Sequence, residues 1–327
     1  MFELEPHTWQ MLGRYIGAGV ALGFGGIGAA IGMGYAAGQA QTGMMRQPKT
    51  QGLMLRTMLI GQAVGSSPSI FALVVGLFIL FVGVSDPEGS AGNFFAALAG
   101  AGFSIGFGAF GSGLGCGWPA GEACEGVARN PRRISQTTQV MIIGQAVAQS
   151  PSIFALVISL ILILRQHTGT DLGLIGVGMG SGLAIGISAL GSGMGSGRTA
   201  GGATHGCSNW PRAYGLTVRT MLIGQAVCET PAIFGMLVAF IMMFAMPSLE
   251  GSIVGFAQVF GAGIAVGLGG VGPGLGSGLT GSSGCLATAT RPDKEPLILR
   301  TMLIGQAVSQ STAIYALIIA LLLLYVM

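Results

Sequence analysis

Nearly the same nine residues occur four times in this chain. The copies read LIGQAVGSS at 59–67, IIGQAVAQS at 142–150, LIGQAVCET at 222–230 and LIGQAVSQS at 303–311. The eighth position of each copy, which we call the acid column, varies. It holds Ser66, Gln149, Glu229 and Gln310. The repetition predicts four equivalent structural units, of which only one has an ionisable group at this position.

The acid column recurs after 83, 80 and 81 residues, so the repeated unit is about eighty residues long. A glycine-rich segment precedes each copy. These segments are GFGGIGAAIGMG (23–34), GFGAFGSGLGCG (106–117), GISALGSGMGSG (186–197) and GLGGVGPGLGSG (267–278). Each unit thus contains a glycine-rich apolar segment, a short polar loop and a second apolar segment. The predicted units are 1–88, 89–168, 169–249 and 250–327.

The composition indicates an all-α membrane protein. The 327 residues have a mean hydropathy of +0.74, and only 8% of them are charged. Such a chain is too apolar for a soluble globular domain, and in lipid a helix satisfies its own backbone hydrogen bonds. We therefore expect four helical hairpins with eight transmembrane helices. The predicted spans are 11–40, 52–84, 92–123, 136–165, 172–204, 214–246, 252–287 and 297–326.

The sixty glycines suggest how these helices pack. Glycine removes side chains from a membrane helix, so that neighbouring backbones approach closely. We expect the glycine-rich helices to form the inner layer of a tight ring, and the Leu-, Ile- and Phe-rich helices to face lipid. The G-x-G-x-x-G matches within the glycine-rich segments do not predict nucleotide binding, because no strand precedes them. The five cysteines show no metal-ligand spacing and are interpreted as buried apolar residues.

The basic residues predict the orientation in the membrane. The loops inside the hairpins and the adjoining helix ends carry 11 of the 14 basic residues, whereas the loops between hairpins are mainly acidic. The positive-inside rule then places the loops inside the hairpins in the cytoplasm or its organellar equivalent, and both termini on the opposite side. We expect a multi-pass protein of a bacterial or archaeal cell membrane or of an organelle inner membrane.

Glu229 lies in the middle of the apolar segment MLIGQAVCETPAIFGMLVAF. An ionisable group at that depth is costly and is by default a candidate functional site. A structural hydrogen-bonding acid is the alternative interpretation. Gln225 precedes Glu229 by one helical turn, and Thr230 follows it directly. A hairpin folded at its loop would bring Ser196, which lies 33 residues before the acid column, level with Glu229.

This combination resembles the c subunit of rotary ATP synthases and ATPases, which has a glycine-rich helix, an Arg-Gln-Pro loop and a carboxylate in its second helix. The segment 305–325 resembles that second helix, with Gln310 in place of the acid. The resemblance implies a rotor ring that carries H⁺ or Na⁺ past a stator a-type subunit, together with other copies or other c-type subunits. It implies no covalent cofactor, no nucleic acid and no catalytic residue. The loop residues expected to contact the central stalk are Arg46, Gln47, Pro48, Arg129, Asn130 and Pro131.

The resemblance also implies a ligand set. In sodium-binding members, a neighbouring second helix supplies a carbonyl two residues before the acid column, a hydroxyl one residue after it and a tyrosine five residues after it. Val308, Ser311 and Tyr315 of the fourth unit match these positions. We therefore expect the site between units three and four, with Glu229 as the ligand of Na⁺. Ser196 stands where sodium-binding members usually have Gln, and the absence of that amide favours H⁺. The remaining groups favour Na⁺, so Na⁺ is the preferred transported ion.

Three of the four positions in the acid column are neutral, which suggests a low number of ions moved per ATP. With one ion for four hairpins, each ion receives about four times the usual share of the energy of ATP, which favours ATP-driven pumping. A mixed ring whose other members carry more acids is also compatible with the sequence. The alternatives are a largely structural member of the ring and an independent channel or transporter.

Overall fold

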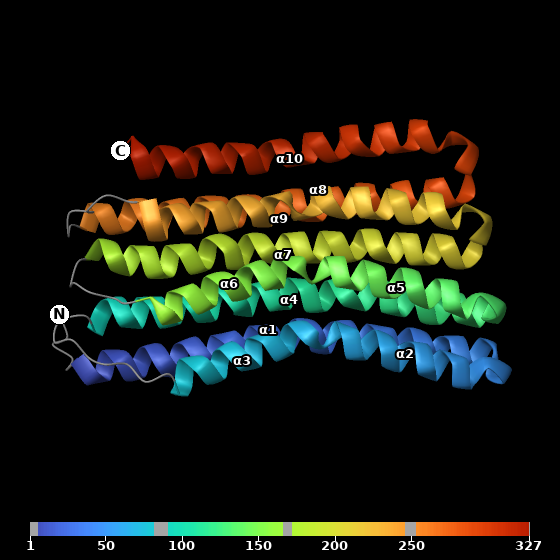
Figure 1. Cartoon of the computed structure of the whole chain (residues 1–327), viewed down its shortest axis with the longest axis horizontal. Helices are drawn as coiled ribbons and strands as arrows, with labels where there is room; N and C mark the ends of the chain where they lie inside the picture. The colour runs from blue at the N-terminus through green and yellow to red at the C-terminus, as the bar shows by residue number, and fades with distance from the viewer. Residues whose placement is uncertain (1–5, 82–90, 166–171, 246–252, 327) are drawn as a thin grey trace.

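The computed structural model describes residues 6–81, 91–165, 172–245 and 253–326. In these residues it shows four antiparallel hairpins that lie side by side (Figure 1). The first arms are α1 (Pro6–Arg46), α4 (Ala91–Arg129), α7 (Leu172–Asn209) and α9 (Ile253–Thr290). The second arms are α2 (Gln51–Gly65) with α3 (Ser67–Phe81), α5 (Ile134–Ala148) with α6 (Ser150–Leu164), α8 (Tyr214–Phe240) with a π-helical turn (Ile241–Ala245), and α10 (Glu295–Tyr325).

The described residues contain eight helical segments that are long and apolar enough to cross a membrane. The prediction of an all-α membrane protein with four hairpins is thus confirmed. The glycine-rich helices continue past the predicted spans at the turn end; α1, for example, runs to Arg46 rather than ending near residue 40. The predicted spans ended where the sequence becomes polar, but the helices continue into the turns. The predicted unit boundaries at residues 88, 168 and 249 lie outside the described residues.

Glycines allow the first arms to pack against one another. The helices α1, α4, α7 and α9 follow in this order, each against the next (Figure 1). A Cβ added at Gly113 of α4 would lie 2.6 Å from the backbone nitrogen of Ala29 in α1. A Cβ at Gly193 of α7 would lie 2.6 Å from the backbone nitrogen of Ser112 in α4. Any side chain at these positions would therefore force the helices apart, as the sequence predicted.

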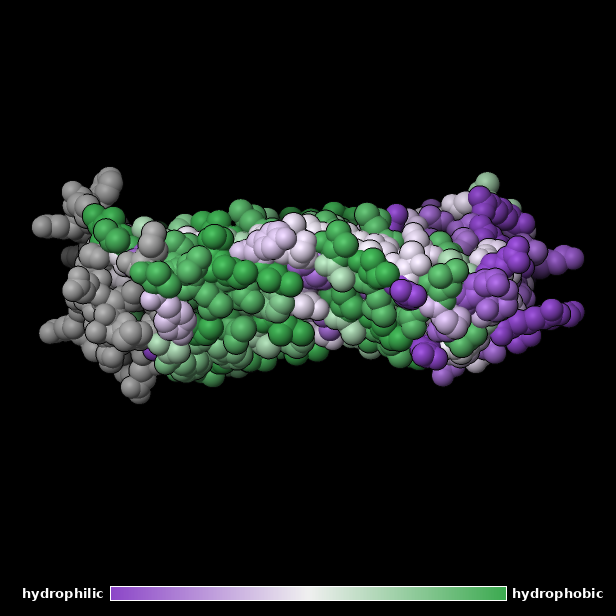
Figure 2. Space-filling view, turned by 90° about the horizontal axis from the view of Figure 1, so that it is seen from above, coloured by the Kyte–Doolittle hydropathy of each residue, from purple (hydrophilic) through white to green (hydrophobic). Residues whose placement is uncertain are grey.

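The second arms form the other layer. They cover one side of the first arms with Leu, Ile and Phe side chains, and much of their other surface is exposed, including Leu77, Phe78 and Ile153. Figure 2 shows an apolar surface over most of the length, and a hydrophilic surface at the end that carries the turns inside the hairpins. This distribution fits a protein that spans a membrane and projects its turns into water.

Each turn inside a hairpin is a short 3₁₀ helix that begins with proline. The four turns are Pro48–Thr50, Pro131–Arg133, Pro211–Ala213 and Pro292–Lys294. Proline suits the first helical position because its fixed φ matches the helix and its missing N–H needs no partner there. The second arm of hairpins one and two is interrupted at the acid column, where Ser66 and Gln149 end α2 and α5. In hairpins three and four this arm is one continuous helix.

Candidate ion-binding site

A row of glutamine amides links neighbouring hairpins four residues before the acid column. The amide nitrogen of Gln225 donates to the carbonyl of Gly144 in hairpin two at 2.9 Å and to the carbonyl of Ser196 in its own hairpin at 3.2 Å. Two other amides repeat this pattern, and their acceptors in the preceding hairpin are Gly61 for Gln145 and Gly224 for Gln306. We call these residues, with Gln62 of hairpin one, the amide row. The sequence singled out Gln225 but did not reveal the row's role between hairpins.

The glutamine side chains of the acid column also reach the preceding hairpin. Gln149 donates to the carbonyl of Val64 in hairpin one at 2.9 Å. Gln310 donates to the carbonyl of Val227 in hairpin three and to the hydroxyl of Ser277, both at 2.9 Å. In each case the side chain reaches the preceding hairpin, at the carbonyl two residues before that hairpin's own acid column.

Glu229 occupies this position in α8. Gln225 lies one turn earlier on the same helix face, so Glu229 also faces α7 and hairpin two. Ser196, as the sequence predicted, is level with it, and its hydroxyl lies beside the carboxyl group. The carboxyl oxygen Oε1 is buried without a hydrogen-bond partner among the described residues, as is the amide Oε1 of Gln310. By the spacing of the repeat, the carbonyl equivalent to those of Val64 and Val227 is Val147.

The expectation that hairpin four completes this site is wrong. Val308 is 70% exposed and Tyr315 is 62% exposed on the free side of α10. Ser311 donates to the carbonyl of Val308 within its own helix at 2.8 Å. The physical reason is the direction of the repeat, because each acid-column side chain reaches the preceding hairpin and not the following one. Hairpin two therefore flanks the carboxylate of Glu229, with Ser150 and Phe154 at the corresponding positions.

Comparison with known proteins agrees with this geometry. The family model for the ATP synthase c subunit matches four times, at residues 16–79, 99–162, 179–242 and 260–323. The chain belongs to the ATP synthase c-subunit family. Each matched stretch falls within one hairpin, so the chain is a c subunit with four fused hairpins, as the sequence resemblance indicated.

The curated relatives named here are short proteins, each about as long as one hairpin unit of this chain. One, the ATP synthase c subunit of Natranaerobius thermophilus, is 46% identical over 78 residues, which cover 24% of this chain and 90% of the relative. That of Syntrophobacter fumaroxidans is 46% identical over 85 residues, covering 26% of this chain and 93% of the relative. Membership of this c-subunit family supports an integral membrane protein with a rotor-ring role in ion translocation.

At the turn end of this four-hairpin protein, a shared ion pair joins hairpins one and two. Arg46 ends α1, and its guanidinium lies 3.2 Å from a carboxylate oxygen of Glu125 in α4. Arg129, one turn after Glu125, contacts the same oxygen. Gln47 and Asn130 directly precede the 3₁₀ turns that start at Pro48 and Pro131. The structure thus gathers the residues that the sequence grouped as a loop surface, and Glu125, which the sequence did not single out, holds two of them.

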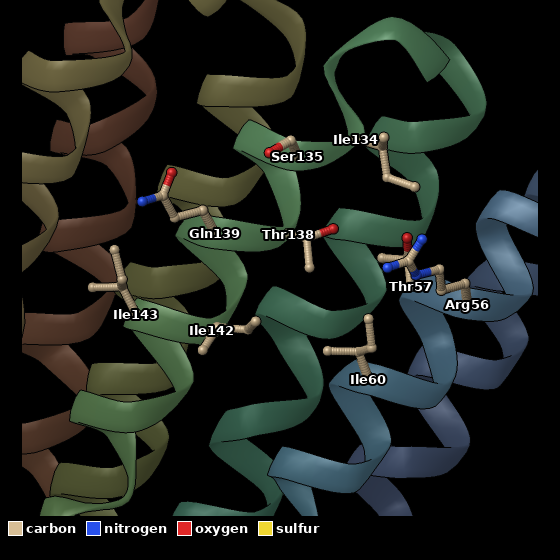
Figure 3. A pocket seen from close by; sticks show the side chains of 9 residues that line it. All are labelled: Arg56, Thr57, Ile60, Ile134, Ser135, Thr138, Gln139, Ile142 and Ile143. Atoms are coloured by element: carbon tan, nitrogen blue, oxygen red, sulfur yellow. The ribbon is translucent and has the colours of Figure 1, made fainter.

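Two other features of the protein are separate from Glu229. A groove of about 580 Å³ lies between α2 and α5 near the turn end, and Figure 3 shows Arg56 with Thr138 and Gln139 along it. Its lining residues include no acidic side chain. Within the described residues, the group with a spacing suited to a metal ion is Glu122, Glu125 and His205. Glu229 is not part of that group, and Thr230, next to it on α8, is half-buried.

Proposed function

We propose that the chain is an ion-carrying member of an ATP synthase rotor ring and that Glu229 holds the ion. One observation carries this proposal. In hairpins two and four, an amide nitrogen at the acid column donates a hydrogen bond to a carbonyl of the preceding hairpin. An ionised carboxylate has only acceptor atoms, so Glu229 cannot make this bond in its charged form.

A bound cation resolves that mismatch. A proton on Glu229 restores a donor, and a sodium ion placed between the carboxylate and the Val147 carbonyl is attracted to both. An empty, charged carboxylate at this depth is costly, so the site is stable when loaded and must meet water or a counter-charge to release its ion. Such a group exchanges its cargo only where the stator provides access.

The proposed cargo is H⁺, with Na⁺ as the second candidate. Hairpin two has Phe154 at the position where the sodium-binding pattern has Tyr, and Ser196 stands where that pattern has Gln. Two of the polar groups expected around sodium are therefore missing. The hydroxyls of Ser196 and Ser150 and the carbonyl of Val147 favour Na⁺, because hard cations prefer oxygen ligands.

Carbodiimide labelling tests both points, because the reagent modifies a protonated carboxyl group that it can reach. We expect one label per chain, at Glu229, with labelling that declines at high pH and is insensitive to Na⁺. Protection by Na⁺ at constant pH would reassign the cargo to sodium. A Glu229 that stays unlabelled in the intact complex at every pH would contradict an ion-carrying role and favour a structural role in the ring.

The open edges of the wall fit a further hairpin. In hairpin one, the Gln62 amide donates to Met33 within its own hairpin, and no described hairpin lies on its other side. At the other edge, Gly305 of α10 is equivalent to Gly61, which accepts from the amide row. A second copy placed head to tail would bring its Gln62 to Gly305 and extend the row, and such contacts close into rings. We therefore propose that several copies form the ring.

A mixed ring is the second candidate. Ser66 of a second copy is too short to repeat the bond that Gln149 makes, and it bonds to Ala63 in its own helix. A c-type subunit with a carboxylate in the acid column would instead face Val308, Ser311 and Tyr315. The mass of the detergent-extracted ring distinguishes the two, because a homomeric ring is a whole multiple of the mass of this chain.

The remaining proposals concern the working direction and the contacts of the ring. With one carboxylate per four hairpins, each ion shares more of the energy of ATP, so we propose ATP-driven pumping. An ion-to-ATP ratio equal to one ion per hairpin, measured in reconstituted vesicles, would contradict this.

The turns with Arg46 and Arg129 would face the cytoplasm and contact the central stalk, while the second arms face lipid and the stator a-type subunit. Cysteine labelling of the turns from one side of sealed vesicles checks the orientation.

A further inference from the structure

A polar pocket of about 370 Å³ lies on the side of the wall opposite to the second arms. All of its lining residues belong to the first arms, and none belongs to α2, α3, α5, α6, α8 or α10. The residues that carry the argument are Trp118 and Glu122 of α4 with Arg198 and His205 of α7. We call this cavity the inner pocket. It is separate from Glu229, which belongs to α8 and faces α7.

Arg198 places a charge unusually deep in this face. The next residue, Thr199, lies with its hydroxyl 3.6 Å from the sulfur of Cys228, the neighbour of Glu229. Arg198 is therefore at nearly the same depth as the ion-binding carboxylate, in the middle of the apolar segment. The equivalent residues of the other hairpins are Tyr35, Trp118 and Leu279, so the repeat does not require an arginine here. An ionised side chain at this depth needs a partner or water.

The pocket supplies Arg198 with an aromatic ring, while its lining carboxylate, Glu122, contacts His205 rather than the arginine. Its guanidinium lies over Trp118, 5.5 Å from the ring centre. Among the described residues, Arg198 forms no ion pair with an acidic side chain, because Glu122 is paired with His205 at 2.7 Å and Glu125 with Arg46 and Arg129. The guanidinium is exposed toward the pocket and keeps its N–H donors available.

The same contacts argue against a metal ion. Glu122, Glu125 and His205 have ligand atoms within 4.8 Å of one another, which would suit a divalent cation. However, two arginines already neutralise Glu125, and Arg198 adds a third positive charge nearby. A cation would have to displace these partners against their charge, whereas an anion would be attracted.

We propose that the inner pocket binds a phosphate group, with Arg198 as its main ligand and His205 as a second donor. Guanidinium and phosphate pair through two parallel hydrogen bonds, and stacking on Trp118 holds the guanidinium plane in place. The phosphate belongs either to a phospholipid headgroup inside the wall or to inorganic phosphate from water. A volume of about 370 Å³ is large enough for a phosphate group from either source.

Tryptophan fluorescence tests the proposal. The full chain has three tryptophans, so Trp9→Phe and Trp210→Phe together leave Trp118 as the only reporter. In this background, the detergent-solubilised protein is titrated with inorganic phosphate, with short-chain phosphatidylglycerol and with the uncharged diacylglycerol of the same chain length. We expect a saturable change in Trp118 emission with a phosphate-containing probe. A response to phosphatidylglycerol alone identifies a lipid headgroup, and a response to both identifies a general phosphate site.

Matched variants show whether the fluorescence response depends on Arg198. Arg198→Gln should weaken the response at least tenfold and Arg198→Lys by a few-fold, because lysine keeps the charge but loses the two parallel bonds. Arg56→Gln, which changes an arginine of the outer groove in Figure 3, should leave it unaltered. Phospholipid phosphorus retained per purified chain, with the helix content of each variant, provides a second readout. An equal response in Arg198→Gln, or an equal response to diacylglycerol, would overturn the proposal.

Discussion

Hairpins three and four differ at the acid column by little more than an amide against a carboxyl group. Gln310 finds the Ser277 hydroxyl on one side and the Val227 carbonyl on the other, and bonds to both at 2.9 Å. Glu229 has the Ser196 hydroxyl beside it, and its Oε1, like that of Gln310, is buried without a partner among the described residues. The difference is the donor, because an ionised carboxylate has none to offer to the preceding hairpin. The same geometry thus holds a permanent hydrogen-bond link in hairpin four. In hairpin three it holds a carboxyl group that, under the proposed function, completes this link only when it carries a proton or a cation.

The largest expected effect comes from making hairpin three like hairpin four. Glu229→Gln should lower ATP-driven cation uptake by about a hundredfold or more, to the background of the assay, because an amide holds no transported ion. Packing should survive, since glutamine already fits this column twice. Uptake into vesicles containing the complete ATP synthase measures the first effect, and the thermal unfolding temperature of the chain measures the second.

The matched control for this change is Gln310→Ser, which copies hairpin one and should leave uptake intact. Undiminished uptake in the Glu229→Gln variant would show that the comparison between the two hairpins has no functional meaning. A loss of the folded state would instead show that the carboxyl group is a structural acid.

Removing the hydroxyl beside each column should have the next largest effect. Ser196→Ala deletes the hydroxyl beside Glu229. A hydrogen bond to a charged group contributes about 1.5 kcal/mol and stabilises the ionised carboxylate, so H⁺ affinity should rise about tenfold, whereas the affinity of a Na⁺ site would fall about tenfold. Ser277→Ala deletes an acceptor of Gln310 and should leave cation affinity unaltered. The pH or the Na⁺ concentration that half-prevents carbodiimide labelling of Glu229 measures the affinity. Equal shifts in both variants would mean that Ser196 acts only through packing.

The sequence predicted the fold because the relevant physics is local and repeated. The length of the apolar segments, their glycine content and the eighty-residue period are properties of single hairpins, so they could be read from the sequence without a structure. The level of Ser196 with Glu229 was also predictable, since a hairpin folded at Pro211 fixes that register. These features depend on distances along one chain segment.

The partner of Glu229 was not predictable in the same way. Val308, Ser311 and Tyr315 match a known ligand pattern, but a pattern does not say on which side the next hairpin packs. Only contacts between hairpins, such as Gln310 with Val227, give that direction. The pairing of Glu125 with Arg46 was missed for the same reason, because the two residues are 79 positions apart and belong to different hairpins.

A smaller effect is expected from the amide row. Gln225→Ala removes the donor to Gly144 and to both oxygens of Ser196, and should loosen the position of that hydroxyl. A hydrogen bond of this kind contributes about 1 kcal/mol, so H⁺ affinity should rise about fivefold, whereas the affinity of a Na⁺ site would fall about fivefold. Gln306→Ala removes the equivalent bonds in hairpin four and should cost similar stability without changing affinity. An unaltered affinity in the first variant would limit the amide row to assembly.

The smallest effect, and the sharpest for the comparison, comes from making hairpin four like hairpin three. Gln310→Glu places a carboxyl group between the Ser277 hydroxyl and the Val227 carbonyl, the environment that we propose for a loaded site. Carbodiimide incorporation should rise about twofold, from one label per chain to two, and the ions moved per ATP should rise in proportion. Gln149→Glu is the matched variant, because Cys116 replaces serine beside it and offers a weaker partner. It should label less readily than Gln310→Glu. If neither variant gained a label, the hydroxyl and carbonyl pair would be insufficient to make a carboxylate an ion carrier, and the properties of Glu229 would have to come from hairpin two alone.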